Sequence, residues 1–343
     1  MGDHTMSTAS QAQQPRRARD LGIVPGVLPT GAHNAITDVA GVHVGHATVA
    51  QGDDIRTGVT AVLPTQLIER RALPANLCVG NGYGKLIGAT QLVELGEIET
   101  PIVLTATLSV FRAADALLTY VMEWPGRERV RSLNPVGAGT GTTALGFKAG
   151  IGTSSRVVDW RPSWRGEPGA ADHPAGQPAG RATVGVLVQS NFSGVLTVSG
   201  VPVRAGEVLP EPGQAALPGM AAPGSSDPDP DPGNSCMIVV ATDARLDSRQ
   251  LGRLATRAIF AMGRVGSDFA SGSGDYAVAF STADETAPAV PESSLDPLFA
   301  AVMEATEEAL LNSLFMARTT VGFRGRVAYA APHQQILDLL RAR

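Results

Sequence analysis

The sequence has little of what disulfide-built, membrane-spanning or nucleic-acid-binding proteins need. Its 343 residues include two cysteines, Cys78 and Cys236, too few for a disulfide framework, so we expect a cytoplasmic location. No segment reaches the roughly 18 consecutive apolar residues that suggest a membrane span. Lys and Arg number 27 against 32 Asp and Glu, a formal net charge of −5 that gives no basic excess for nucleic acid. We therefore expect a small molecule or a second copy of the chain as the partner.

Common cofactor and nucleophile motifs are also missing. The Gly-rich runs contain neither a Walker lysine pattern nor a dinucleotide fingerprint, and there is no Gly-x-Ser-x-Gly elbow. His43 and His46 stand three residues apart in an expected strand, so their side chains point to opposite faces and make a poor metal pair. We predict no cofactor and no metal.

What is present is a globular composition, with 43% hydrophobic and 17% charged residues. The 39 glycines and 24 prolines predict many turns and short strands. Residues 1–19 lack the apolar stretch of a secretory signal, and we expect them to form a disordered extension.

Apolar periodicity predicts alternating strands and helices, an α/β class. In the first part of the chain we expect strands at 35–39, 42–46, 57–63, 102–108 and 183–189, and helices at 88–95 and 110–123. Beyond residue 235 the pattern predicts a strand at 236–242, a helix at 249–264, a strand at 276–281 and a helix at 296–316. Asp247 and Pro297 are suited to the starts of these two helices.

A Pro-rich, low-complexity segment separates these two parts of the chain. Residues 210–233 are too polar and too interrupted by proline to pack, which predicts a flexible linker. The linker ends at Asn234 and Ser235, and an apolar strand begins at once. A strand that starts where a linker ends can present its first residue at a free end.

Ser235 is the candidate nucleophile. Serine is a weak nucleophile near neutral pH and needs a base. A cut between Asn234 and Ser235 would free an α-amino group with an ordinary pKa of about 7.7–8.0, able to accept the hydroxyl proton. The competing interpretation makes Ser235 an ordinary turn residue, since Gly-Asn-Ser is common in turns. In a strand Cys236 would face away from Ser235, so we expect it to be a small buried hydrophobe.

Several segments, in this order, carry a resemblance that no single one would establish. They are 19–26, 34–39, 42–46, 81–85, 137–141, 150–156, 189–192, Ser235 with 238–243, and 271–275. Together the chain resembles the DmpA and BapA group of self-processing aminopeptidases, the S58 peptidase family, over nearly its whole length from Arg19.

The resemblance implies a four-layer α/β/β/α sandwich like that of N-terminal nucleophile hydrolases. Residues 20–343 would form one catalytic domain, cut into an α chain 1–234 and a β chain 235–343, and assembled as a homo-oligomer, a tetramer of αβ units. The substrate would be a short peptide, amide or ester with a free amino terminus.

The resemblance also implies the roles of the site residues. Ser235 would be the nucleophile, and Ser273 and Asp275 would hold and polarise it and its amine. Asn191 would donate its side-chain amide to the oxyanion; without the resemblance, an asparagine at a strand end is usually a turn former. Because Ser273 and Asp275 stand two apart, their side chains face the same site in extended backbone.

One departure from the family leaves alternatives open. After a segment like 130–136, relatives carry an acidic residue, an Asn-Asp-Gly stretch and a helical piece that bind the substrate's free amine. Here Val136 is followed directly by Gly137. One alternative is a self-processed but non-catalytic assembly or binding protein, and a weaker one is an acyltransferase. Glu123 or Glu128 could replace the missing acidic group.

Overall fold

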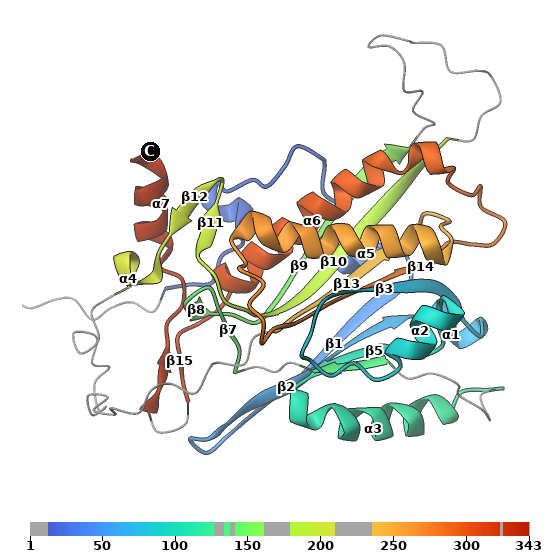
Figure 1. Ribbon diagram of the computed structural model, residues 1–343, viewed down its shortest axis with the longest axis horizontal. Helices are drawn as coiled ribbons and strands as arrows, with labels where there is room; N and C mark the ends of the chain where they lie inside the picture. The colour runs from blue at the N-terminus through green and yellow to red at the C-terminus, as the bar shows by residue number, and fades with distance from the viewer. Residues whose placement is uncertain are drawn as a thin grey trace, which may run out of the picture.

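Two β-sheets stacked face to face, each covered on its outer side by helices, make up the fold (Figure 1). The computed structural model describes residues 13–126, 134–137, 141–160, 179–209, 235–322 and 325–342, with the backbone alone described for 134–137. Asn234 and the predicted linker at 210–233 lie outside the described residues. None of the helices within these ranges combines the length and hydropathy that crossing a membrane requires.

The larger sheet has six strands in the spatial order β4-β3-β14-β13-β10-β9. Their bounds are Glu97–Ile98 for β4, Leu73–Gly82 for β3, Gly274–Ser281 for β14, Ser235–Thr242 for β13, Gly180–Asn191 for β10 and Ile151–Trp160 for β9. β13 runs parallel to β14 and antiparallel to β10. The strand that begins at Ser235 therefore lies in the middle of this sheet.

The smaller sheet has the order β1-β2-β5-β6, and short hairpins and helices complete the fold. The strands are β1 (Val42–Gln51), β2 (Ile55–Pro64), β5 (Ile102–Thr105) and β6 (Asn134–Gly137). The short strands are β7 (Thr143–Ala144), β8 (Phe147–Lys148), β11 (Leu196–Val198), β12 (Val201–Val203), β15 (Thr320–Val321) and β16 (Val327–Ala328). The helices are α1 (Gln66–Glu69), α2 (Ala89–Leu95), α3 (Val110–Met122), α4 (Ala205–Val208), α5 (Ser248–Met262), α6 (Asp296–Phe315) and α7 (His333–Arg341).

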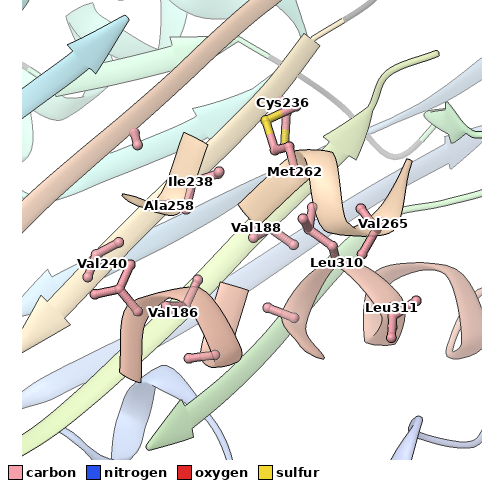
Figure 2. Close-up of a cluster of buried hydrophobic side chains, with 14 of the residues drawn as sticks. Val186, Val188, Cys236, Ile238, Val240, Ala258, Met262, Val265, Leu310 and Leu311 are labelled. Atoms are coloured by element: carbon pink, nitrogen blue, oxygen red, sulfur yellow. The ribbon is translucent and has the colours of Figure 1, made fainter. Parts of the chain in front are cut away.

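Side-chain alternation along the strands builds two main cores. On β13, Cys236, Ile238 and Val240 pack against α5 and α6, whereas Met237 and Val239 pack between the two sheets. Figure 2 shows the first of these cores, in which strand side chains meet Ala258 and Met262 of α5 and Leu310 and Leu311 of α6. Both faces of β13 are buried, which explains its uninterrupted apolar run.

A smaller cluster completes the layers. Val103 of β5 packs against Leu117 and Val121 of α3, on the side of the smaller sheet that faces away from the larger one. The layers therefore run α5 and α6, six strands, four strands, α3. The predicted α/β/β/α sandwich is confirmed, as is the order strand, helix, strand, helix after Ser235.

The predicted strand at 35–39 is wrong. Ile36–Asp38 form a 3-10 helix, because the Asp38 carboxylate accepts hydrogen bonds from the backbone N–H groups of His33 (2.9 Å) and Ala35 (3.0 Å). Short polar side chains that bond nearby backbone in this way compete with extended structure.

The predicted disordered extension 1–19 is too long. Residues 1–12 lie outside the described part, but residues 13–19 rest on the body of the protein. Ala18 is fully buried and its N–H donates to Asn312 Oδ1 of α6 at 2.9 Å. Arg19 Nε lies 2.9 Å from the buried Glu308 carboxylate, which also pairs with the buried Arg156 at 2.7 Å. Polar contacts to α6, together with the burial of Ala18, therefore order this segment.

Candidate active site

Three strand ends meet at Ser235. Ser235 is the first residue of β13, and its direct partners are Asn191, the last residue of β10, on one side and Gly274, the first residue of β14, on the other. Ser235 and Asn191 are both half-buried, so solvent reaches this end of the sheet. The sheet order thus brings together residues 191, 235 and 274 from three separate segments.

The side-chain amide of Asn191 has a fixed orientation. Its Oδ1 accepts a hydrogen bond from the backbone N–H of Thr143 in β7, at 3.1 Å. With the oxygen held by this donor, the two donors of the amide lie on Nδ2. Directly opposite partners in an antiparallel pair point their side chains to the same face, so the Asn191 amide and the Ser235 hydroxyl share one side of the sheet.

Ser273 and Asp275 are in contact with each other, as their spacing predicts. Ser273 Oγ donates to Asp275 Oδ1 at 2.7 Å, and both residues are almost completely buried. Asn81 Nδ2 donates to Asp275 Oδ2 at 3.1 Å, and the backbone N–H of Cys236 also donates to this carboxylate. The acidic group therefore reaches the main chain of the residue that follows Ser235.

Burial has the largest effect on the pKa of Asp275. Desolvation raises the pKa of Asp275 above its ordinary value, although the hydrogen bonds from Ser273, Asn81 and the Cys236 backbone oppose the rise. A carboxylate with a raised pKa is a stronger base than an exposed one. Burial, reinforced by the Asp275 charge, also raises the pKa of the Cys236 thiol well above its usual range. The protonated thiol is a poor nucleophile.

Cys236 faces away from Ser235, as predicted. Its side chain is fully buried on the α5 and α6 side of the sheet, beside Met262 (Figure 2). Asp275 is the direct partner of Cys236 in the parallel pair of β13 and β14, so its side chain starts from the same face as Cys236. The Asp275 carboxylate therefore approaches Ser235 from the main-chain side. The Asn191 amide lies on the same face of the sheet as the Ser235 hydroxyl.

Close packing at Gly274 brings the segment 83–84 near Ser235. A Cβ added to Gly274 would lie 3.3 Å from Ser235 Oγ and 2.5 Å from Gly84 Cα, so this approach requires glycine at 274. The segment is held by two hydrogen bonds, from the Tyr83 N–H to the Ser273 carbonyl and from the Tyr276 hydroxyl to the Gly84 carbonyl, both 3.2 Å long.

The sequence missed the supporting contacts of this site. The roles of Thr143 and Asn81 follow from hydrogen bonds that span 48 and 194 residues of chain, and no local pattern signals them. Within the described ranges, no group of three or more His, Cys, Asp or Glu side chains is placed to hold a metal ion.

Comparison with known proteins gives a consistent match over the chain. The model of peptidase family S58 matches residues 34–136 and 133–328. The β-peptidyl aminopeptidase BapA of Sphingosinicella microcystinivorans is 34% identical over 400 residues, covering 98% of this chain and 94% of the relative. The alignment is longer than the 343 residues of this chain, so some residues of the relative stand opposite gaps in this chain. The two segments of the family match overlap at residues 133–136.

Solved structures agree with the sequence match. A β-aminopeptidase from a Burkholderia species superposes with a TM-score of 0.74 at 32% identity, covering 95% of this chain and 99% of its own. The L-aminopeptidase D-Ala-esterase/amidase of Ochrobactrum anthropi superposes with a TM-score of 0.75 at 27% identity, covering 95% of this chain and 98% of its own. It is described as a prototype for the serine aminopeptidases and as a new variant among the Ntn hydrolase fold.

Proposed function

The chain belongs to peptidase family S58, whose members are peptide-bond hydrolases, and from this premise we propose that it is a self-cleaving serine aminopeptidase. It cuts its own backbone between Asn234 and Ser235. The new β chain 235–343 then releases amino-terminal residues from short peptides, amides or esters.

The observation that carries the proposal is the placement of Ser235. As first residue of a central strand it has a side-chain amide directly opposite on β10 and a buried acid–hydroxyl pair at the start of β14. A nucleophile, an oxyanion donor and an acidic group are the parts that acyl transfer requires.

In self-cleavage, Ser235 Oγ attacks the carbonyl carbon of Asn234 and forms an ester as the peptide C–N bond breaks. The departing nitrogen takes up the hydroxyl proton and becomes the α-amine of Ser235. Water then hydrolyses the ester and releases the carboxylate of Asn234. The pair of Ser273 and Asp275 stabilises the main chain at Cys236 during this step, and the raised pKa of Asp275 suits it to accept a proton.

In substrate turnover the freed α-amine of Ser235 accepts the proton of its own hydroxyl. Oγ attacks the carbonyl of the substrate's first residue, and Asn191 Nδ2 donates to the oxyanion. Collapse of the tetrahedral intermediate returns the proton to the leaving amine and leaves an acyl-enzyme. Water activated by the same α-amine then releases the amino acid.

Family membership favours hydrolysis over the alternatives of a non-catalytic binding protein and an acyltransferase. BapA is named as a β-peptidyl aminopeptidase and the Ochrobactrum enzyme as an L-aminopeptidase and D-Ala-esterase. We propose the same class of amino-terminal substrate here. We expect the stretch missing after Val136 to give this chain a residue preference different from that of these enzymes.

We also propose that processed molecules self-associate. The outward side of the α3 region exposes four apolar side chains separated by three, seven and four residues, a spacing that places them near one face of a helix. These are Leu108, Phe111, Leu118 and Met122, of which Leu108 and Phe111 are 97% and 68% exposed. Light scattering coupled to size exclusion would show a mass several times that of one chain, a tetramer in our expectation. The cytoplasmic location stays a prediction.

The test of the activity is a panel of amino-acid p-nitroanilides, β-alanyl amides and D-alaninamide, assayed with the wild type and with Ser235→Ala. We expect turnover of at least one substrate by the wild type and none by the variant. The same substrate with its amine acetylated should not be cleaved. Turnover by Ser235→Ala would exclude Ser235 as nucleophile, and an inactive but processed wild type would favour the binding-protein alternative.

A further inference from the structure

A cavity of about 280 Å³ lies between the two sheets, next to the Ser235 site. Its lining includes Leu104 and Thr60 from the smaller sheet and Lys148 and Gln189 from the other side. Gln189 precedes Asn191 by two residues on β10, so the two side chains share one face with Cα atoms about 7 Å apart. The cavity therefore continues the side of the sheet on which the Ser235 hydroxyl lies.

Lys148 places a cation in this cavity. It is 6% exposed, and its Nζ donates to the carbonyl oxygens of Thr142, at 3.0 Å, and Ala149. In the described part of the chain no carboxylate forms an ion pair with it. Burial lowers the pKa of Lys148 to about 8, so the ammonium form still dominates at pH 7. A buried charge without a counter-charge is costly, and a ligand carboxylate would supply one.

Gln189 adds a hydrogen-bond acceptor to the lining of the same cavity. It is 4% exposed, and its Oε1 is buried without a hydrogen-bond partner in the described part of the chain. An unpaired buried acceptor costs about 1–3 kcal/mol, which a ligand N–H would relieve. The other titratable lining residue, His46, is exposed at the rim with its Nδ1 2.9 Å from Thr60 Oγ1. The interior thus offers one ammonium donor and one amide acceptor.

The last residue of a peptide carries a carboxylate and a backbone N–H on the same α-carbon. We propose that this cavity binds the carboxy-terminal residue of a short peptide substrate, its carboxylate paired with Lys148 Nζ and its N–H donated to Gln189 Oε1. This assignment rests on the proposed function and gives its substrate class: short peptides with a free carboxyl terminus.

The kinetic test compares alanyl-alanine and alanyl-alanyl-alanine with their carboxy-terminal amides. Of the two peptides with a free carboxyl terminus, the one that the wild type cleaves better should have a kcat/KM at least tenfold above that of its own amide. Lys148→Met should reduce this ratio to within about twofold of one, whereas Lys148→Arg should retain most of it. Gln189→Glu, which brings a competing carboxylate to Lys148, should also reduce it. Because each comparison is a ratio within one variant, a general loss of activity does not mimic the result.

A matched control and a second pair of substrates locate the effect. Lys85→Met removes the other lysine of the chain, which is exposed and does not line the cavity, and should keep the ratio. Glutamyl-alaninamide and glutaminyl-alaninamide place the carboxylate on the amino-terminal residue instead. A preference for that acid, or a ratio unchanged in both Lys148→Met and Gln189→Glu, would overturn the assignment.

A binding measurement separates this proposal from the proposed function. The probe is the dipeptide with its scissile amide reduced to a methylene amine, titrated calorimetrically into the wild type and into Lys148→Met as acid and as carboxy-terminal amide. Tighter binding of the acid to the wild type alone would support the cavity assignment even without turnover of any peptide. Equal binding of acid and amide by the wild type would overturn it, even with an active peptidase.

Discussion

Asn191 and Ser235 are direct partners across β10 and β13, and the backbone N–H of Thr143 holds the Asn191 amide oxygen at 3.1 Å. This relationship fixes a donor beside the first residue of a central strand. The oxyanion role that we propose for Asn191 can therefore be tested without disturbing the rest of the sheet.

Asn191→Asp keeps the acceptor that Thr143 uses and removes the amide donors. We expect kcat to fall by about 100- to 1000-fold, as for loss of one oxyanion donor worth roughly 2.7–4 kcal/mol. Thr143→Ala is the matched control, because the contact comes from its backbone, and it should retain near-normal kcat. A kcat for Asn191→Asp within tenfold of the wild type would exclude this role.

Ser273→Ala removes a hydrogen-bond donor to the buried Asp275 carboxylate, so the loss of unfolding free energy that it causes should depend on pH. Burial holds the pKa of Asp275 above its unfolded value, so the carboxylate is protonated in acid and ionised at higher pH. The lost bond stabilises the ionised form, worth about 1.5–3 kcal/mol. The loss of unfolding free energy should therefore be small near pH 4 and grow towards pH 8, as measured by urea unfolding.

Ser281→Ala is the control for this pH dependence. Ser281 is the last residue of β14, the strand that begins directly after Ser273, is as buried as Ser273, and donates at 2.6 Å to the neutral carbonyl of Ala244. The loss of unfolding free energy in Ser281→Ala should be the same at pH 4 and pH 8. A parallel pH response in both variants would show that Asp275 is not the group that titrates.

Gly274→Ala should disturb the approach of the 83–84 segment to Ser235. The added Cβ would meet Gly84 Cα at 2.5 Å and Ser235 Oγ at 3.3 Å. We expect a lower melting temperature and slower self-cleavage, followed by gel electrophoresis over time. Gly82→Ala is its partner in the β3–β14 register and meets nothing within 4 Å, so it should behave as the wild type. Normal cleavage and stability in Gly274→Ala would refute the close approach.

Lys148 should make stability rise in mild alkali. Its pKa is about 8 in the folded protein against about 10.5 in the unfolded chain, so the unfolded chain binds more protons between these values. The unfolding free energy of the wild type should therefore increase by about 3 kcal/mol from pH 8 to 10.5 relative to Lys148→Met. Lys85→Met, at an exposed position, should follow the wild type. A constant difference between the wild type and Lys148→Met across this range would exclude a buried ammonium.

The part of the fold that follows Ser235 could be predicted because its elements are the core. The strand at 235–242 and the helix at 248–262 bury continuous or periodic apolar residues, and the Asp247 carboxylate caps the helix by accepting a hydrogen bond from the Gln250 N–H. Apolar periodicity is the strongest local signal in a sequence. Where packing follows that signal, the predicted bounds hold within two residues.

What escaped prediction depends on polar contacts between distant segments. The ordering of residues 13–19 comes from Ala18 and Arg19 meeting α6, 294 and 289 residues later in the chain. The cavity beside Ser235 is likewise made by Lys148 and Gln189 from different strands facing the smaller sheet. The spacing of Ser273 and Asp275 predicted their contact, because two residues apart in extended chain is a local relationship.

The central claim is that Ser235 becomes an amino terminus, and an intact-mass spectrum of the freshly purified protein tests it most directly. We predict two chains, 1–234 and 235–343, for the wild type and a single uncut chain for Ser235→Ala. A single chain for the wild type, or a cut at any other bond, would contradict the account.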